Sequence, residues 1–337
     1  MLKYLREDIK TLKSYEVNQE EFRVKLDANE GIEWMDGKNR YPDDSCTILK
    51  ERLANKLGKK TSELLIGNGS SELIELVMKA YLEYGEIVVS ISPTFSMYKL
   101  YTIINKGVYE EYPLKDMQKL DVEGFMEFVK LKKPKIIILS NPNNPTGSII
   151  SRENILRIVE DCDCMVILDE AYIEFADVEI QDYTREYKNL VVLRTFSKAY
   201  ALAGIRLGYM IGNEEIIEYI NRVRSPYNIN TITQNLGLEA LDNEVEIMKN
   251  ISLIKIERER VFKKLKDLGF KPFPSQANFI FFKGKETLSY DLARKKILIR
   301  AFSGELKGYY RISIGRPEEN DLALKAIEEA LNETGHN

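Results

Sequence analysis

The sequence predicts an α/β fold with a mostly parallel central sheet in a large domain, plus a smaller α+β domain. In the middle of the chain, short apolar runs alternate with helical patterns, which is typical of parallel strands joined by crossover helices. After about residue 240 the pattern changes to one long charged helix followed by separate strand patterns. We therefore expect the large domain at residues 40–240. The small domain, with the N-terminal segment, is expected at residues 1–39 and 241–337.

The strands of the large domain are expected at short, mainly apolar runs, because parallel strands are buried on both faces. These runs lie at residues 86–90, 135–140, 165–169 and 190–193, and helical patterns separate them at 151–160 and 213–224. Before them, segment 70–84 carries one apolar stripe at intervals of three and four residues, which predicts an amphipathic helix.

The small domain is expected from a different order of elements. A charged helix is predicted at 243–268, then a strand at 277–282, a helix around Leu288 and Leu292, a strand at 310–314 and a last helix at 318–332. Residues 1–30 lack an apolar core of their own, so we expect them to pack against this unit.

Composition and charge argue against several classes of protein. The chain has 337 residues with 49 basic and 53 acidic side chains, a net charge of −4, whereas nucleic-acid binders usually carry a basic face. No run approaches the 18 or so apolar residues of a membrane span, and the charged N-terminus lacks the apolar core of a signal peptide. Three cysteines, an odd and sparse number, favour a reducing cytoplasm.

The scarcity of histidine narrows the chemistry further. The one histidine, His336, is the next-to-last residue, which argues against a Ser–His triad, a Cys–His pair and a His-ligated metal. Cys162 and Cys164 alone are too few for a zinc site, and we interpret them as small apolar residues near a strand start. We therefore expect no metal, and proton transfer by Lys, Tyr, Asp, Glu, Cys or a cofactor.

Two candidate segments directly follow predicted strands, at the sheet edge where α/β proteins bind ligands. Segment 140–147 holds two prolines and three asparagines; it is either a plain turn or a turn whose amide groups donate to a ligand. Asp169 ends an apolar strand, where a carboxylate is costly unless it is paired. Its partner is either a protonated ring nitrogen or the start of the next helix.

A third segment centres on Lys198, which is the one charged residue between Thr195 and Ile205. A lysine in a partly apolar pocket has a lowered pKa and can form an imine. Arg206 follows eight residues later and, with the hydroxyls of Thr195 and Ser197, suits a phosphate. The alternative is an ordinary surface lysine after a strand.

A fourth segment is the glycine turn Gly67–Ser71 at the start of the predicted helix 70–84. Free backbone N–H groups and the helix dipole favour an anion there. The turn matches neither a P-loop nor a clean dinucleotide fingerprint, so a simple glycine-containing helix start is the alternative.

The order and spacing of these segments resemble one family. Asn144 precedes Asp169 by 25 residues, and Asp169 precedes Lys198 by 29. With the strings NPTG, DEAY and SKAYALAGIRLGY, the chain resembles the fold-type I pyridoxal-phosphate (PLP) aminotransferases, and among them the histidinol-phosphate aminotransferases, from about residue 6 to residue 330. The resemblance implies the fold-type I architecture and pyridoxal 5'-phosphate as the cofactor.

The resemblance also implies roles for single residues. Lys198 would hold PLP as a Schiff base and move the proton between substrate and cofactor. Asp169 would keep the ring nitrogen protonated, which makes the ring an electron sink. Tyr172 and Asn144 would hydrogen-bond the phenolic oxygen of the ring, and Phe95 would stack on it.

The cofactor phosphate would be held by a larger set of residues. These are Gly69, Ser70, Ser71, Thr195, Ser197, Arg206 and, from a neighbouring subunit, Tyr41. The resemblance therefore implies a homodimer whose two active sites are shared between subunits.

For the substrate, the resemblance implies transamination of L-histidinol phosphate with 2-oxoglutarate, giving imidazole acetol phosphate and glutamate in histidine biosynthesis. Arg311 would bind the carboxylate of glutamate. Arg300 and Tyr15 would bind the substrate phosphate, and Asn29 would lie close to the substrate.

Three alternatives remain at the level of sequence. One is an aromatic or broad-specificity aminotransferase, and another is a threonine-phosphate decarboxylase on the same fold. Asn29-Glu30 favours the aminotransferases. The third is a non-catalytic regulator, against which the intact set of Lys198, Asp169 and Arg206 argues.

Overall fold

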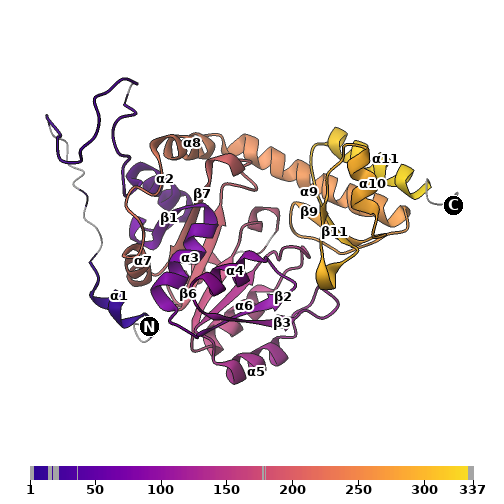
Figure 1. Ribbon diagram of the computed structural model, residues 1–337, viewed down its shortest axis with the longest axis horizontal. Coiled ribbons are helices and arrows are strands. Elements are labelled where there is room, and N and C mark those ends of the chain that lie inside the picture. Colours follow the sequence, from indigo (N-terminus) through magenta and orange to yellow (C-terminus); the bar gives the residue numbers. More distant parts are fainter. Residues whose placement is uncertain are drawn as a thin grey trace.

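The computed structural model describes residues 4–13, 17, 23–35, 37–176, 178 and 180–332. Their strands form a seven-stranded sheet and a separate four-stranded sheet (Figure 1). The strands of the first sheet are β1 (Leu64–Asn68), β2 (Ile87–Ser92), β3 (Val108–Pro113), β4 (Ile136–Ser140), β5 (Met165–Asp169), β6 (Leu190–Thr195) and β7 (Leu207–Gly212). Their order is β1-β7-β6-β5-β4-β2-β3, and all neighbours are parallel except β7, which is antiparallel to β1 and to β6. The predicted α/β fold with a mostly parallel sheet is confirmed.

The centre of this sheet forms because its strands are apolar on both sides. Every residue of β4 and β5 is buried. The two strands pair in parallel, so that Ser140 lies opposite Asp169 at their carboxyl ends. A parallel strand with two covered faces needs such an apolar run, and the run in turn fixes where the first polar residues appear.

Helices cover both faces of the sheet. Ile136 and Ile138 of β4 pack in one core with α3 and α7, whereas Ile137 and Leu139 pack in another with α2, α5 and α6. This alternation is the period-two pattern of a strand. The helices of this part are α2 (Thr47–Leu57), α3 (Gly69–Tyr81), α4 (Met97–Ile104), α5 (Val122–Lys132), α6 (Arg152–Asp161), α7 (Glu214–Asn221) and α8 (Thr231–Asp242).

The second sheet is antiparallel, in the order β10-β11-β9-β8, and lies at the other end of a long helix (Figure 1). Its elements are α9 (Glu244–Asp267), β8 (Lys271–Pro272), β9 (Phe279–Lys283), α10 (Leu288–Arg294), β10 (Arg300–Ala301), β11 (Tyr309–Ser313) and α11 (Pro317–Asn332). One core of α9, α10, α11 and the sheet holds this unit together. The boundaries between domains stay a prediction.

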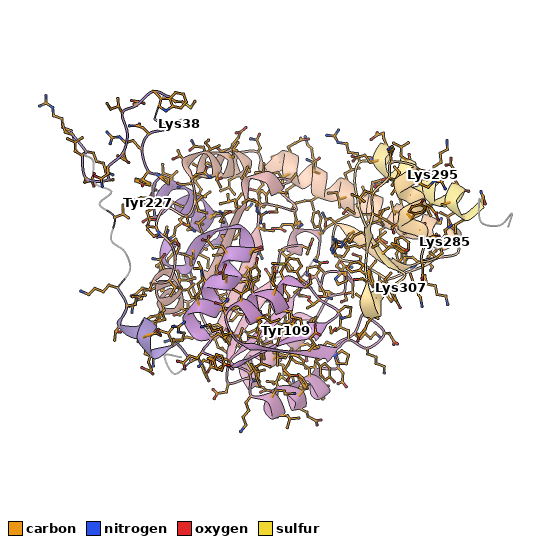
Figure 2. All side chains as sticks on the ribbon, in the orientation of Figure 1. Lys38, Tyr109, Tyr227, Lys285, Lys295 and Lys307 are labelled. Atoms are coloured by element: carbon orange, nitrogen blue, oxygen red, sulfur yellow. The ribbon has the colours of Figure 1, made fainter. Side chains whose placement is uncertain are left out.

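The N-terminal helix α1 (Glu7–Thr11) corrects one expectation. Leu5 and Ile9 are buried in the core that contains α3, and the Arg6 N–H donates to the carbonyl of Ala80 at 3.1 Å. This part of the N-terminal segment therefore packs against the large sheet and not against the small unit. Farther along, Lys38 lies on a stretch that projects from the body of the molecule (Figure 2).

Five strands were not predicted, namely β1, β3, β7, β8 and β10. Of these, β1 and β7 pair with Gly67 opposite Gly208, and a Cβ on Gly208 would lie 2.6 Å from the backbone nitrogen of Ser70. Glycine is needed here because helix α3 begins so close to the neighbouring strand, and the same glycines interrupt the apolar pattern by which a strand is predicted. Among the described residues, no helix is long and apolar enough to cross a membrane.

Candidate active site

A cavity of about 870 Å³ lies at the carboxyl ends of the parallel strands, between the two sheets. Most of the predicted site residues line it, namely Ser70, Ser71, Phe95, Asn144, Asp169, Tyr172, Thr195, Ser197, Lys198, Arg206, Arg300 and Arg311. Other residues that line the cavity had no predicted role of their own, although Ser140 and Pro145 belong to the candidate segment 140–147. They are Thr94, Ser96, Tyr98, Ser140, Pro145, Ala171, Ala301, Phe302, Ser303 and Leu306. The structure thus brings together, in one cavity, segments far apart in the sequence.

Lys198 lies in the turn that follows β6. Its Nζ is 5.5 Å from the centroid of the Tyr172 ring. Burial, and then the positive charge of Arg311, lower the pKa of Lys198, and the carboxylate of Asp169 opposes this change. A lysine with a lowered pKa has a larger fraction of its amine unprotonated, which is the form that attacks a carbonyl or accepts a proton.

Asp169, the last residue of β5, is only 5% exposed. Its Oδ2 accepts a hydrogen bond from the Tyr98 hydroxyl at 2.7 Å, and its Oδ1 accepts one from the Ala171 N–H at 3.1 Å. Burial raises the pKa of Asp169, while these two donors and the nearby Lys198 ammonium oppose the rise. The carboxylate faces the cavity and suits a cationic ring nitrogen.

An anion-binding corner forms where α3 begins. Gly69 has a φ of +74°, and a Cβ there would lie 2.6 Å from Nη2 of Arg206. Only glycine lets the guanidinium approach the helix N-terminus so closely. Arg206 Nη1 donates to Ser197 Oγ at 3.2 Å, and the side chains of Ser70 and Ser71 face the same cavity. Helix N–H groups, hydroxyls and a guanidinium together suit a phosphate.

These features match the PLP that the resemblance implies. The cavity offers a carboxylate for the ring nitrogen, an amine for the aldehyde carbon and a cationic corner for the phosphate. Phe95, whose ring centroid lies 5.5 Å from that of Tyr98 in an edge-on arrangement, also lines this cavity. The residues present therefore fit this cofactor.

Two arginines border the side of the cavity that faces the small sheet. Arg300 of β10 and Arg311 of β11 are directly opposite each other in the antiparallel pair. Arg311 Nη1 donates to Oδ1 of Asn144, and its guanidinium lies 5.1 Å from the Phe279 ring centroid. Burial, and the charge of Arg300, lower the pKa of Arg311, while Tyr172 opposes this change. Like charges directly opposite on neighbouring strands destabilise a sheet, so this pair favours an anionic ligand.

Two predicted residues, Tyr41 and Asn29, lie elsewhere. Tyr41 is 54% exposed and stacks on Tyr227, with ring centroids 4.4 Å apart. Figure 2 shows Tyr227 on the side of the molecule toward the N-terminal segment. Asn29 is exposed in that segment, with a φ of 54°. Tyr15 lies outside the described residues. The structure therefore does not bring Tyr41 or Asn29 to the cavity of their own chain.

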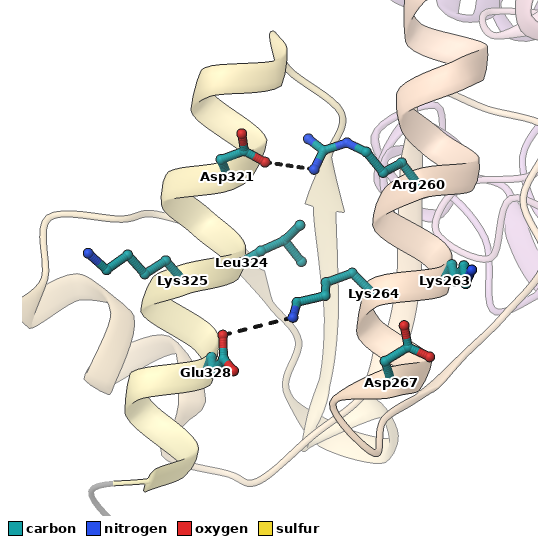
Figure 3. A pocket seen from close by; sticks show the side chains of 8 residues that line it. All are labelled: Arg260, Lys263, Lys264, Asp267, Asp321, Leu324, Lys325 and Glu328. Atoms are coloured by element: carbon teal, nitrogen blue, oxygen red, sulfur yellow. Dashed lines mark hydrogen bonds and ion pairs between the residues drawn. The ribbon is translucent and has the colours of Figure 1, made fainter.

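A second hollow, of about 410 Å³, lies between α9 and α11 (Figure 3). It is also bordered by basic side chains, but carboxylates pair with several of them. Arg260 contacts Asp321 at 2.6 Å, and Lys264 lies 3.9 Å from Glu328. With its charges compensated in this way, the hollow offers no comparable site.

Comparisons with known proteins agree with the geometry of the cavity. The family model described as aminotransferase class I and II matches residues 9–327. The chain is 39% identical to the histidinol-phosphate aminotransferase of Thermoanaerobacter pseudethanolicus, covering 97% of this chain and 98% of that protein.

Solved structures agree as well. The histidinol-phosphate aminotransferase from Sinorhizobium meliloti, in complex with pyridoxal-5'-phosphate, matches with a TM-score of 0.83 and 26% identity over 88% of this chain and 84% of that one. The histidinol-phosphate aminotransferase from Clostridium acetobutylicum matches with a TM-score of 0.81 and 28% identity, over 88% of this chain and 92% of that one.

Proposed function

Since the chain belongs to the class I and II aminotransferases, we propose that it catalyses the PLP-dependent transamination of L-histidinol phosphate with 2-oxoglutarate in histidine biosynthesis. The products are imidazole acetol phosphate and glutamate. The family and the cofactor are the ones predicted from the sequence.

The substrate assignment rests on the pair Arg300 and Arg311. The two guanidinium groups lie on neighbouring strands and line one cavity. One partner in the reaction carries a phosphate and the other a carboxylate. Arg311, half-buried and held by Asn144, suits the carboxylate of glutamate, whereas the exposed Arg300 suits the phosphate of histidinol phosphate.

Different residues of the cavity would act on different parts of the cofactor. PLP, when bound, supplies an electron sink for the electrons of the substrate C–H bond. Lys198 Nζ would accept the proton from that carbon and donate it to the cofactor, and its lowered pKa keeps the amine available for this. Asp169 would accept the hydrogen bond of the ring nitrogen. Arg206, with the first turn of α3, would bind the phosphate and so fix the position of the ring.

The amide of Asn144 is oriented by a neighbour. Because Arg311 donates to its Oδ1, its NH₂ group is left to donate to an oxygen in the cavity. The Tyr172 hydroxyl lines the same wall, and burial raises the pKa of Tyr172 to about 12, so the phenol stays protonated and can also donate. Both donors suit the phenolic oxygen of the ring.

The proposal includes a homodimer that works in the cytoplasm. Tyr41 is exposed on a segment that does not reach its own cavity, which supports a role at the phosphate of a second subunit. Co-expressed Lys198→Ala and Tyr41→Ala subunits would then form one intact site per mixed dimer and recover activity, and a lack of recovery would contradict sharing. The three cysteines are free and buried, which supports a reducing compartment.

The substrate is tested by single-turnover half-reactions followed by the cofactor's absorbance. We expect histidinol phosphate to react faster than phenylalanine, and threonine phosphate to be neither transaminated nor decarboxylated at a comparable rate. Equal rates with phenylalanine would favour an aromatic or broad-specificity enzyme. Release of CO₂ from threonine phosphate would favour the decarboxylase.

A further inference from the structure

Tyr98 is a cavity residue for which no role was predicted. It lies in the first turn of α4, is 0% exposed and lines the cavity beside Phe95. Its hydroxyl reaches Asp169, 71 positions along the chain, and donates to Oδ2 at 2.7 Å. A buried phenol whose single hydroxyl proton is committed to a carboxylate fixes the direction of that carboxylate.

The carboxylate has one such partner on each oxygen. The donor to Oδ1 is the backbone N–H of Ala171, which the fold of the turn after β5 supplies. The donor to Oδ2 is the Tyr98 side chain. Tyr98 is therefore the member of this arrangement that a side-chain substitution can remove while the backbone stays intact.

The surroundings of Tyr98 keep it a donor. Burial, and then the charge of Asp169, raise the pKa of the Tyr98 phenol well above its usual value, so the hydroxyl retains its proton. Ser140, opposite Asp169 on β4, also lies beside the phenol. The other charged group that acts on Asp169 is the Lys198 ammonium, which favours the ionised carboxylate. Without Tyr98, the buried carboxylate of Asp169 would have one hydrogen-bond donor fewer to stabilise its ionised form.

We propose that Tyr98 is a positioning residue for the cofactor: by donating to Asp169 it keeps that carboxylate ionised and directed, and so keeps the proton on the ring nitrogen. This inference rests on the proposed function, since it requires PLP in the cavity. A carboxylate that loses its donor becomes more basic and draws the shared proton toward itself. The ring then withdraws electrons less strongly.

The test compares Tyr98→Phe with Tyr81→Phe as a matched control. Tyr81 is 2% exposed in α3 and does not line the cavity, so both variants remove one buried hydroxyl. The first measurement is the pH midpoint of the visible absorbance change of each holoenzyme. A positive ring nitrogen opposes a second positive charge on the cofactor. We therefore expect the midpoint to move to higher pH in Tyr98→Phe and to stay unchanged in Tyr81→Phe.

The second measurement isolates the ring nitrogen. Apoprotein is titrated with PLP and with its deaza analogue, in which C–H replaces the ring nitrogen. The wild type should prefer PLP. Loss of a hydrogen bond to a charged group should reduce this preference about tenfold in Tyr98→Phe. In an Asp169→Asn background the same substitution should change the preference little, because the carboxylate that Tyr98 holds is absent.

Several results would overturn the inference. One is an unchanged midpoint and preference in Tyr98→Phe, and another is an equal change in Tyr81→Phe. If Tyr98→Phe fails to fold by thermal melting, Tyr98 is replaced by 3-fluorotyrosine, a stronger donor of nearly the same shape, and the midpoint should move to lower pH. No movement would again contradict the role. A wild type that binds no PLP would instead contradict the proposed function itself.

Discussion

Two hollows in this molecule are bordered by basic side chains, and they differ in what faces those charges. Between α9 and α11, Arg260 pairs with Asp321, and Lys264 lies near Glu328 (Figure 3). Arg260 also pairs with Glu257 of its own helix. In the cavity between the sheets, Arg300 and Arg311 face each other.

Within the described part of the chain, neither Arg300 nor Arg311 forms an ion pair, and the same holds for Arg206. The comparison teaches that cations paired with carboxylates stabilise a surface, whereas cations held together without carboxylates mark the place of an anionic ligand.

The largest expected effect is at Lys198. Replacing Lys198 with alanine removes the amine to which we assign both the binding of the cofactor aldehyde and the transfer of the proton, so the rate of transamination should fall by about 10⁴-fold or more. The absorbance band of the lysine-bound cofactor should also be lost. Lys263→Ala, at the hollow between α9 and α11, is the control and should retain both. A Lys198→Ala protein with substantial turnover would contradict the assignment.

The next effect is at Arg311. Arg311→Ala should lower kcat/KM for glutamate by about 100-fold, because a half-buried guanidinium that binds a carboxylate is lost. Arg311→Lys should recover only part of this, since an ammonium cannot form the two parallel hydrogen bonds. Steady-state kinetics with glutamate as the varied substrate measure it. An unchanged value in Arg311→Ala would place the carboxylate elsewhere.

A smaller and more selective effect is expected at Arg300. Arg300→Ala should raise KM for histidinol phosphate by about tenfold and leave the glutamate half-reaction close to wild type, because we assign the exposed guanidinium to the phosphate of the substrate. Phenylalanine, which lacks a phosphate, should react as before. Equal losses for all three amino donors would show that Arg300 supports the strand pair and not the substrate.

The smallest effect is expected in the paired hollow. Arg260→Ala should leave all three half-reactions unchanged and lower the free energy of unfolding by only about 1 kcal/mol, since its contacts are partly exposed ion pairs. Chemical denaturation measures the stability. A loss of activity in Arg260→Ala would contradict the view that only the cavity between the sheets binds the substrates.

The parts of the fold that could be predicted are those whose local pattern determines them. The run Met165–Asp169 is a strand at its predicted bounds, because five buried residues in parallel pairing require an apolar run. The long charged pattern at 243–268 is α9, within one residue at each end. The roles of single site residues stay predictions, although the cavity assembles most of them.

The parts that could not be predicted depend on contacts across the chain. Gly67 and Gly208 interrupt the apolar pattern from which β1 and β7 could have been predicted. Glycine is required at these positions because elements far apart in the sequence approach each other closely there. Tyr98 looks like any aromatic residue on the buried face of a helix. Nothing near it in the sequence shows that its hydroxyl ends at Asp169.

The facing arginines of β10 and β11 also make the response to ionic strength depend on occupancy. In the empty cavity, mobile anions weaken the repulsion between Arg300 and Arg311, because at physiological salt the Debye length is about 8 Å. With a substrate anion between the two guanidinium groups, the same salt competes for them. Raising the salt concentration should therefore stabilise the small sheet of the free enzyme and weaken the binding of its phosphorylated substrate.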